Sequence, residues 1–370
     1  MRIRYFTHSL LSCWNHGNAH FLRGVLDELI RRGHQVQVFE PDDSWSLENL
    51  LADHGEAGIE PFRAYYPALS STALQPGADL EPLVDGADLV IVHEWNEPGL
   101  VAALGRLRKR GAGFTLLFHD THHRAVSAPE EMARFDLSGY DGVLAFGEAL
   151  TEVYRRRGWG NRVWTWHEAA DTRRFHPPTV EIERKGLVWI GNWGDGERSS
   201  EIESYLLAPA EAAGLPLMVY GVRYPVAAKQ RLAWYHAAYE GWAANPQVPQ
   251  IFARFMATVH VPRRFYADQL PGIPTIRVFE ALACGIPLAC APWPDSEGLF
   301  RPGTDYLVAR HGAEMTRHLR ALKSDADLRR ELAGNGLETI RARHTCAHRV
   351  DELLAIVEGI SAPPQTEAAA

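Results

Sequence analysis

The sequence predicts an α/β protein with two Rossmann-like, doubly wound domains that face a cleft. The first observation is the length of 370 residues, which exceeds one ordinary core and suits two domains. The second is that short apolar runs alternate with amphipathic segments, as in parallel sheets with right-handed crossovers. The third is that polar residues follow several of these runs, at the edge where open α/β sheets bind their ligands.

The N-terminal domain is predicted over residues 1–170. A helix is expected over residues 19–32, where Gly33 ends it. Buried strands are expected over residues 2–7, 35–39, 88–93, 114–119 and 142–146. The polar residues that follow the last three strands should line the cleft: His93, Glu94, His119, Asp120, Gly147 and Glu148.

The C-terminal domain is predicted over residues 180–345, after a linker near residues 163–178 that is rich in small residues and proline. A helix is expected over residues 199–213 and a further helix over residues 346–360. Residues 361–370 have a composition typical of a disordered tail. Strands are expected over residues 187–190, 217–220, 258–261, 286–291 and 306–309.

Composition narrows the classes of partner. The net charge of -8 argues against a nucleic-acid or anionic-membrane partner. The four cysteines have no CxxC or zinc spacing, so a reduced, cytoplasmic chain is expected. No apolar run approaches the roughly 20 residues that span a bilayer, so no integral membrane segment is expected. Residues 1–5 carry two arginines, but polar residues soon follow them, so no signal peptide is expected.

The most informative segment is residues 274–291, which read as a loop, a short helix, a glycine stop and a buried strand. Thr275 is expected to cap the helix with its side chain, and Gly285 to end it in a left-handed conformation. Helices of this length are marginal by themselves. The helix is therefore expected to act through its N-terminus, where free amides and the positive dipole end receive a phosphate.

Arg277 and Glu280 lie three residues apart on one face of this helix. A guanidinium suits a diphosphate and a carboxylate suits the paired hydroxyls of a ribose. The pair therefore predicts nucleotide binding. The alternative is a structural helix with an Arg–Glu pair on its surface.

Residues 274–291 resemble the donor-site helix of GT-B glycosyltransferases of the "glycosyl transferases group 1" type, most closely the CgeB-like branch. The resemblance covers most of residues 187–354 and is weaker over residues 1–170. It implies transfer of a sugar from a nucleotide-diphosphate sugar, a UDP-sugar first, to a hydroxyl of a glycan, lipid-linked or small-molecule acceptor. It also implies a C-terminal helix that crosses back to the N-terminal domain, and no metal or other cofactor.

The family pattern has two glutamates separated by seven residues. Glu280 matches the second, which the resemblance assigns to the nucleotide ribose. The first falls on Gly272, so the glutamate that touches the donor sugar in the family has no counterpart at that position.

The predicted donor site includes a glycine-rich loop over residues 191–196, between a strand and a helix. Glycines let the backbone approach an anion closely. The alternative is a tight turn with a solvated arginine. The loop lacks the GxxxxGK[ST] pattern of ATP-hydrolysing proteins.

Arginines near three strand ends could neutralise the charge of the diphosphate. The donor-binding candidates are Gly191, Asn192, Trp193, Arg198, Arg223, Arg263, Thr275, Arg277 and Glu280, and the loop also contains Asp195.

The acceptor side offers four candidate catalytic residues: His16, Glu94, His119 and Asp120. Each follows a predicted strand, and each could serve as a general base near an acceptor hydroxyl. The sequence does not decide between inversion and retention. The histidines around His119 match no zinc spacing, so no metal site is predicted.

Two further readings of the chain stay open. A GxGxxG fingerprint is absent after the first strand, which excludes an ordinary dinucleotide oxidoreductase. A non-hydrolysing sugar-nucleotide epimerase and a catalytically silent binding protein remain alternatives to a glycosyltransferase.

The aromatic residues at 235, 239 and 242 have helical spacing, which favours a core face over a carbohydrate platform.

Overall fold

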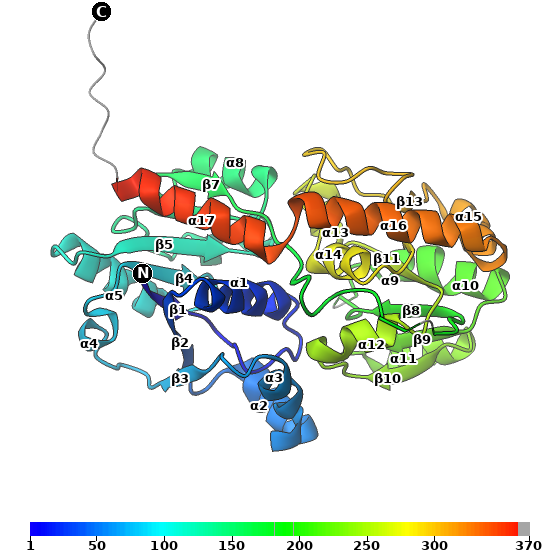
Figure 1. The fold of residues 1–370 in the computed structure, drawn as a ribbon, viewed down its shortest axis with the longest axis horizontal. Helices are drawn as coiled ribbons and strands as arrows, with labels where there is room; N and C mark the ends of the chain where they lie inside the picture. The colour runs from blue at the N-terminus through cyan, green and yellow to red at the C-terminus, as the bar shows by residue number, and fades with distance from the viewer. Residues whose placement is uncertain (181, 195, 362–370) are drawn as a thin grey trace, which may run out of the picture.

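The computed structural model describes residues 1–180, 182–194 and 196–361, and these form two parallel β-sheets that lie side by side (Figure 1). We call residues 1–165 the first half, residues 166–186 the linker and residues 187–345 the second half. The chain completes the first sheet before it starts the second. The predicted fold class, α/β with two Rossmann-like domains, is confirmed.

The first sheet has seven parallel strands in the order β3-β2-β1-β4-β5-β6-β7. The central strands β4 and β5 are buried along their whole length, as expected for a sheet with both faces covered. The strands are β1 (Arg2–Phe6), β2 (Gln35–Pro41), β3 (Ser71–Leu74), β4 (Leu89–His93), β5 (Thr115–Asp120), β6 (Gly142–Ala145) and β7 (Val163–Thr165). The helices are α1 (Ala19–Arg31), α2 (Trp45–His54), α3 (Glu60–Tyr65), α4 (Glu81–Val84), α5 (Pro98–Lys109), α6 (Arg124–Ser127), α7 (Pro129–Met132) and α8 (Glu148–Arg157).

The second sheet repeats this connectivity with six parallel strands in the order β10-β9-β8-β11-β12-β13. The strands are β8 (Leu187–Ile190), β9 (Leu217–Tyr220), β10 (Ala238–Gly241), β11 (Ala257–His260), β12 (Leu288–Cys290) and β13 (Leu307–Val308). The helices are α9 (Ser199–Ile202), α10 (Ala208–Ala212), α11 (Val226–Trp234), α12 (Val248–Phe252), α13 (Arg264–Asp268), α14 (Ile276–Ala283), α15 (Gly312–Ser324), α16 (Ala326–Arg343) and α17 (Cys346–Ser361).

The strand orders fix where ligands can bind. The order reverses between β1 and β4 in the first sheet and between β8 and β11 in the second. At such a point the loops after neighbouring strands run to opposite faces and leave a crevice at the carboxyl ends. Both crevices contribute to the site described below.

The last helix, α17, crosses back to the first half, as predicted. In Figure 1 helix α16 lies over the second half and α17 over the first. Arg32 at the end of α1 forms an ion pair of 2.5 Å with Asp351 of α17. The indole nitrogen of Trp166 donates a hydrogen bond of 2.9 Å to the carbonyl of Arg349. The domain boundaries themselves remain predictions, and the expected tail lies outside the described residues except for Ser361, which ends α17.

One hydrophobic cluster extends from one half to the other through the linker. It includes Phe21 of α1, Trp166 and Phe175 of the linker, and Phe279 of α14. The rings of Phe21 and Trp166 lie 5.0 Å apart. The two halves are therefore packed together along the linker.

The structure contains three strands that the sequence did not predict, β3, β7 and β10. All three are edge strands with partly exposed side chains, so none produces a buried apolar run, and β7 lies where the linker was expected to begin. The helical reading of residues 235–242 is wrong, because α11 ends at Trp234 and Tyr239 lies on β10. His236 has a φ of 53°, which ends the helical path.

The predicted helix over residues 199–213 is present but contains a π-helical turn over Glu203–Leu207 between α9 and α10. The predicted strand over residues 286–291 is shorter, because only Leu288–Cys290 pair with β11 and β13. Among the described residues, no helix is both long enough and apolar enough to span a membrane.

Candidate active site

Two adjoining cavities lie between the halves, at the carboxyl ends of the strands. The main cavity has a volume of about 570 Å³ and the smaller cavity about 200 Å³. The smaller one lies against the second half, beyond β8, β9 and β11. The two cavities are continuous, because they share the following lining residues: Asn15, His16, Gly17, Asn192, Arg198, Arg263, Tyr266, Thr275 and Ile276.

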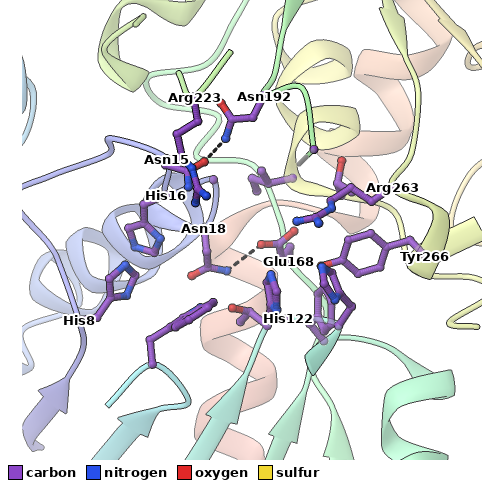
Figure 2. A pocket seen from close by; sticks show the side chains of 18 of the residues that line it. His8, Asn15, His16, Asn18, His122, Glu168, Asn192, Arg223, Arg263 and Tyr266 are labelled. Atoms are coloured by element: carbon purple, nitrogen blue, oxygen red, sulfur yellow. Dashed lines mark hydrogen bonds between the residues drawn. The ribbon is translucent and has the colours of Figure 1, made fainter. Parts of the chain in front are cut away.

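The second half places three arginines on the main cavity, and these are the three that the sequence predicted: Arg198, Arg223 and Arg263. Figure 2 shows Arg223 beside Asn192, and Arg263 beside Tyr266 across the cavity. The Nε of Arg263 donates a hydrogen bond of 2.6 Å to Glu197, and the side chain of Arg263 is 27% exposed. This wall is therefore suited to an anionic ligand.

Arg198 is built into the protein more deeply than the other two. Its Nη1 donates to the carbonyl of Val261, and its Nη2 donates to the carbonyl of Asn192 at 2.7 Å. Its guanidinium lies 5.3 Å from the centre of the Trp189 ring. Burial lowers the pKa of Arg198 to about 10. Arg198 therefore joins two loops of the cavity wall as well as lining it.

The glycine-rich loop is held by hydrogen bonds on both sides. The carbonyl of Gly191 accepts a hydrogen bond of 2.8 Å from the hydroxyl of Tyr224. The side chain of Asn192 accepts from the amide of Val222 at 3.1 Å and donates to Asn15 of the first half.

Trp193 does not line either cavity, contrary to its prediction as a donor-binding residue. Its side chain is buried in the second half, and its indole nitrogen donates a hydrogen bond of 2.7 Å to Ser199. Asp195, the remaining acidic residue of the loop, lies outside the described residues.

Helix α14 brings its N-terminus to both cavities through Thr275 and Ile276. Thr275 occupies the N-cap position, but its side chain makes no capping hydrogen bond. Its hydroxyl lies instead 3.1 Å from the Nε2 of His260, at the end of β11. The predicted side-chain cap is therefore wrong. Gly285 ends the helix with a φ of 59°, as predicted.

Glu280 lines neither cavity, contrary to the prediction that it holds the donor ribose. Its side chain is completely buried, accepts a hydrogen bond of 2.6 Å from Asn245 and pairs with Arg277. Burial raises the pKa of this carboxyl. Its two partners, Asn245 and Arg277, do line the smaller cavity, so Glu280 acts on that cavity through them.

The structure also explains the glycine at position 272. Gly272 has a φ of 89°, and a Cβ atom there would lie 2.4 Å from the Oγ of Ser296 and 3.0 Å from the Cγ of Glu297. A glutamate at this position would have a strained positive φ, and the side chains of Ser296 and Glu297 would have to shift to accommodate its Cβ.

Three of the four predicted catalytic residues lie outside the cavities. Glu94 is fully buried and forms an ion pair of 2.6 Å with Arg124. Asp120 accepts a hydrogen bond of 2.7 Å from Tyr154, and His119 lies 2.6 Å from the hydroxyl of Tyr5. All three side chains are buried and line neither cavity, whereas Trp95 and Thr121, which follow Glu94 and Asp120, form part of the wall.

The fourth candidate, His16, does line both cavities. Its ring lies 4.1 Å from the ring of His8. Burial lowers the pKa of His16 well below its usual value, so the ring is neutral at physiological pH. A neutral imidazole can accept a proton or a hydrogen bond from a hydroxyl group.

Sequence reasoning missed Glu168, a linker residue at the centre of the main cavity. In Figure 2 its carboxylate lies between Asn18 on one side and Arg263 and Tyr266 on the other. Its Oε1 accepts a hydrogen bond of 2.7 Å from Asn18, and burial raises its pKa to about 8. The available signal was a carboxylate pair, Glu168 and Asp171, in a linker of small residues, and the sequence indicated only a hinge there.

No group of three or more histidine, cysteine, aspartate or glutamate side chains in residues 1–180, 182–194 and 196–361 is arranged to hold a metal ion. The histidines at 119, 122 and 123 therefore do not converge on one point.

Comparison with known proteins identifies the class. The family described as "Glycosyl transferase-like" matches residues 198–355, and the family described as "Glycosyltransferase Family 4" matches residues 17–174. With the two facing Rossmann-like halves, these matches define the chain as a glycosyltransferase of the GT-B fold. No curated protein matches the chain in sequence.

Several solved structures share this fold at low sequence identity. An α-glucosyltransferase (AGT) in complex with UDP has a TM-score of 0.70 at 14% identity, covering 97% of this chain and 100% of that chain. HepE of Anabaena in complex with UDP has a TM-score of 0.66 at 13% identity, covering 97% and 100%. The T4 phage β-glucosyltransferase (BGT) in complex with UDP and Mn²⁺ has a TM-score of 0.60 at 14% identity, covering 98% and 100%.

Proposed function

We propose that this glycosyltransferase takes its sugar from a nucleoside diphosphate sugar, a UDP-sugar first, and transfers it to a hydroxyl group of an acceptor bound by the first half. The observation that carries the proposal is the division of charge across the cleft. Arg223 and Arg263 line the second-half wall near the N-terminus of α14, whereas the facing wall of the first half is polar and neutral. The leaving diphosphate gains charge as the glycosidic bond breaks, and cations with helix amides stabilise that charge.

The smaller cavity fits the nucleoside. Its lining includes the apolar side chains of Val222, Trp242 and Val248, next to the polar side chains of Asn245 and Arg277. An apolar slot with a few fixed polar groups suits a base and its ribose. The UDP complexes of the structurally similar glycosyltransferases support uracil as the first base to test.

Three finer assignments belong to the same proposal. We propose that the arginines replace a metal ion, because they line the place where the diphosphate would bind. We assign the second half to the CgeB-like branch on the resemblance of residues 274–291. The four cysteines are all free, which supports a reducing compartment such as the cytoplasm.

Calorimetry with UDP, GDP, ADP and dTDP tests the proposal. We expect UDP to bind more tightly than the other three, with the affinity unchanged when EDTA is added. Incubation with UDP-glucose and other UDP-sugars should then release UDP faster when an acceptor is present. If no nucleoside diphosphate binds, the donor assignment is wrong. If binding disappears with EDTA, the arginines do not replace a metal.

A further inference from the structure

The first-half wall of the main cavity has a composition of its own. Within the described residues it contains no lysine, arginine, aspartate or glutamate side chain. The lining residues from this half are His8, Asn15, His16, Gly17, Asn18, Trp45, Trp95, Thr121, His122, His123 and Phe146. An anionic acceptor would need cations here, and a DNA acceptor would need several, because phosphates are held by Lys and Arg. The wall therefore favours an uncharged ligand.

The histidines of this wall supply hydrogen-bonding groups without charge. Burial keeps the pKa of His8 and of His123 at about 3, and that of His16 and His122 well below the usual value. Ring nitrogens of all four have no hydrogen-bond partner among the described residues: His8 Nδ1, His16 Nε2, His122 Nδ1 and His123 Nε2. Buried polar atoms are ordinarily paired, so unpaired ones around a cavity point to a polar ligand.

Two tryptophans add flat apolar surface to the same wall. Trp45, the first residue of α2, is 36% exposed, and its ring lies parallel to that of His8 with centres 5.9 Å apart. The guanidinium of Arg124 lies 4.0 Å from the centre of the Trp95 ring, so it covers one face. Trp95 also lines the cavity, where its ring lies 5.1 Å from that of His122 and 6.0 Å from that of His8.

The ion pair behind Trp95 gives this ring a fixed position. Arg124 donates to the Oε2 of Glu94 at 2.6 Å and to the carbonyl of the same residue at 2.5 Å. Both side chains are largely buried, and Glu94 is fully so. Glu94, which the sequence suggested as a general base, therefore supports the ring of Trp95 through Arg124 instead.

We propose that the first-half wall binds an uncharged sugar as the acceptor, with the sugar ring against Trp95 and Trp45 and its hydroxyls paired with the cavity histidines. Aromatic faces combined with a few neutral hydrogen-bonding groups suit a ring that has apolar C–H faces and polar edges. This inference rests on the proposed function, since it names the acceptor class for the same transfer. The sugar can be a free saccharide or the end of a longer glycan.

A glycan array probed with the full chain in the presence of UDP tests the inference. We expect binding to neutral hexose-terminated glycans and none to glycans ending in uronic or sialic acid, and a labelled DNA duplex should not bind. Free maltose and lactose as competitors distinguish a saccharide site from one that needs a longer glycan. Binding to acidic glycans, to DNA or to no glycan would overturn the inference.

Variants separate this site from the donor site. Trp45→Ala and Trp95→Ala should each weaken glycan binding at least tenfold and leave the UDP affinity within twofold. Trp234→Ala is the matched control, because Trp234 is 73% exposed at the end of α11 and lines neither cavity. Unchanged glycan binding in both cavity variants would overturn the inference. Loss of UDP binding in the wild-type protein would instead refute the proposed function.

Discussion

Arg198 and Arg263 line the same two cavities but use their hydrogen bonds differently. Arg198 is 8% exposed and donates to two backbone carbonyls, those of Val261 and Asn192. Arg263 is more exposed and pairs with one carboxylate, that of Glu197. Backbone carbonyls that lose a buried charged donor have no substitute, whereas a carboxylate near water can be hydrated.

We therefore predict different costs for the two alanine variants. Arg198→Ala should lower the free energy of unfolding by about 2–4 kcal/mol, because it leaves two carbonyls unpaired and a cavity behind. Arg263→Ala should cost less than about 1 kcal/mol of stability but lower kcat by tenfold or more, because it removes charge beside the leaving diphosphate. Urea denaturation and steady-state kinetics measure both effects. Equal stability losses would contradict the structural role of Arg198.

Glu168 should make stability depend on pH. Burial raises its pKa from 4.5 to about 8, so in the native state it keeps its proton over a range where the unfolded chain has lost it. The native state then binds more protons than the unfolded state, and stability falls as the pH rises from about 4.5 to about 8.

Glu168→Gln removes this titration while a side-chain oxygen remains for Asn18. Between pH 5 and pH 8 we expect the wild-type protein to lose about 1–3 kcal/mol relative to the variant. Thermal unfolding of both proteins at the two pH values measures the difference, and other titrating groups cancel in the comparison. Parallel curves would show that Glu168 is ionised in the native cleft.

At the scale of elements, local sequence signals were sufficient for most of the fold. Apolar runs predicted β4, β5, β8 and β9, and the bounds of β8 and β9 agree with the structure. The edge strands β3, β7 and β10 were missed because a short strand with partly exposed faces has no buried apolar run. Strand, helix and glycine signals act over a few residues, so one sequence can reveal them.

Local sequence signals could not predict which side chains pair with one another within the site. Thr275 pairs with His260, which lies 15 residues earlier, and Glu280 pairs with Asn245, which lies 35 residues earlier. The sequence identified the helix and its glycine stop but predicted that Glu280 contacts the nucleotide ribose directly. Which buried groups meet depends on how β11 and the loop before α12 pack, and no local pattern encodes this.

Helix α14 should therefore transmit a change at Glu280 to the nucleotide cavity. In Glu280→Gln, Arg277 loses its buried carboxylate while the side-chain volume is kept. We expect the free energy of unfolding to fall by about 2–4 kcal/mol and UDP binding to weaken by about tenfold, because Arg277 loses the charge that holds it beside Asn245. Chemical denaturation and calorimetry measure the two effects.

Glu331→Gln on the exposed side of α16 is a suitable control and should change neither quantity. If Glu280→Gln loses stability as expected but still binds UDP with the wild-type affinity, α14 does not act on the nucleotide cavity through this residue.

At the scale of the whole molecule, the halves meet both along the linker and around the cavities. Along the linker they share a continuous hydrophobic cluster that contains Trp166 and Phe175. Around the cavities a second cluster joins Phe146 to Tyr266, and the rings of His54 and Trp242 lie 4.7 Å apart. A change in the width of the cleft would therefore rearrange the contacts around the cavities while the cluster along the linker stays packed, as at a hinge.

We predict that a nucleoside diphosphate stabilises the closed arrangement, because the cations of one wall and the polar groups of the other must both contact the reacting sugar. Closure also excludes water, which would otherwise hydrolyse the donor. Small-angle scattering should give a smaller radius of gyration with UDP than without it. In Asn192→Ala, which loses the hydrogen bond to Asn15, the ligand-free protein should have a larger radius than the wild type. Identical profiles with and without UDP, where calorimetry confirms binding, would show a rigid cleft and would require the acceptor to enter a permanently closed site.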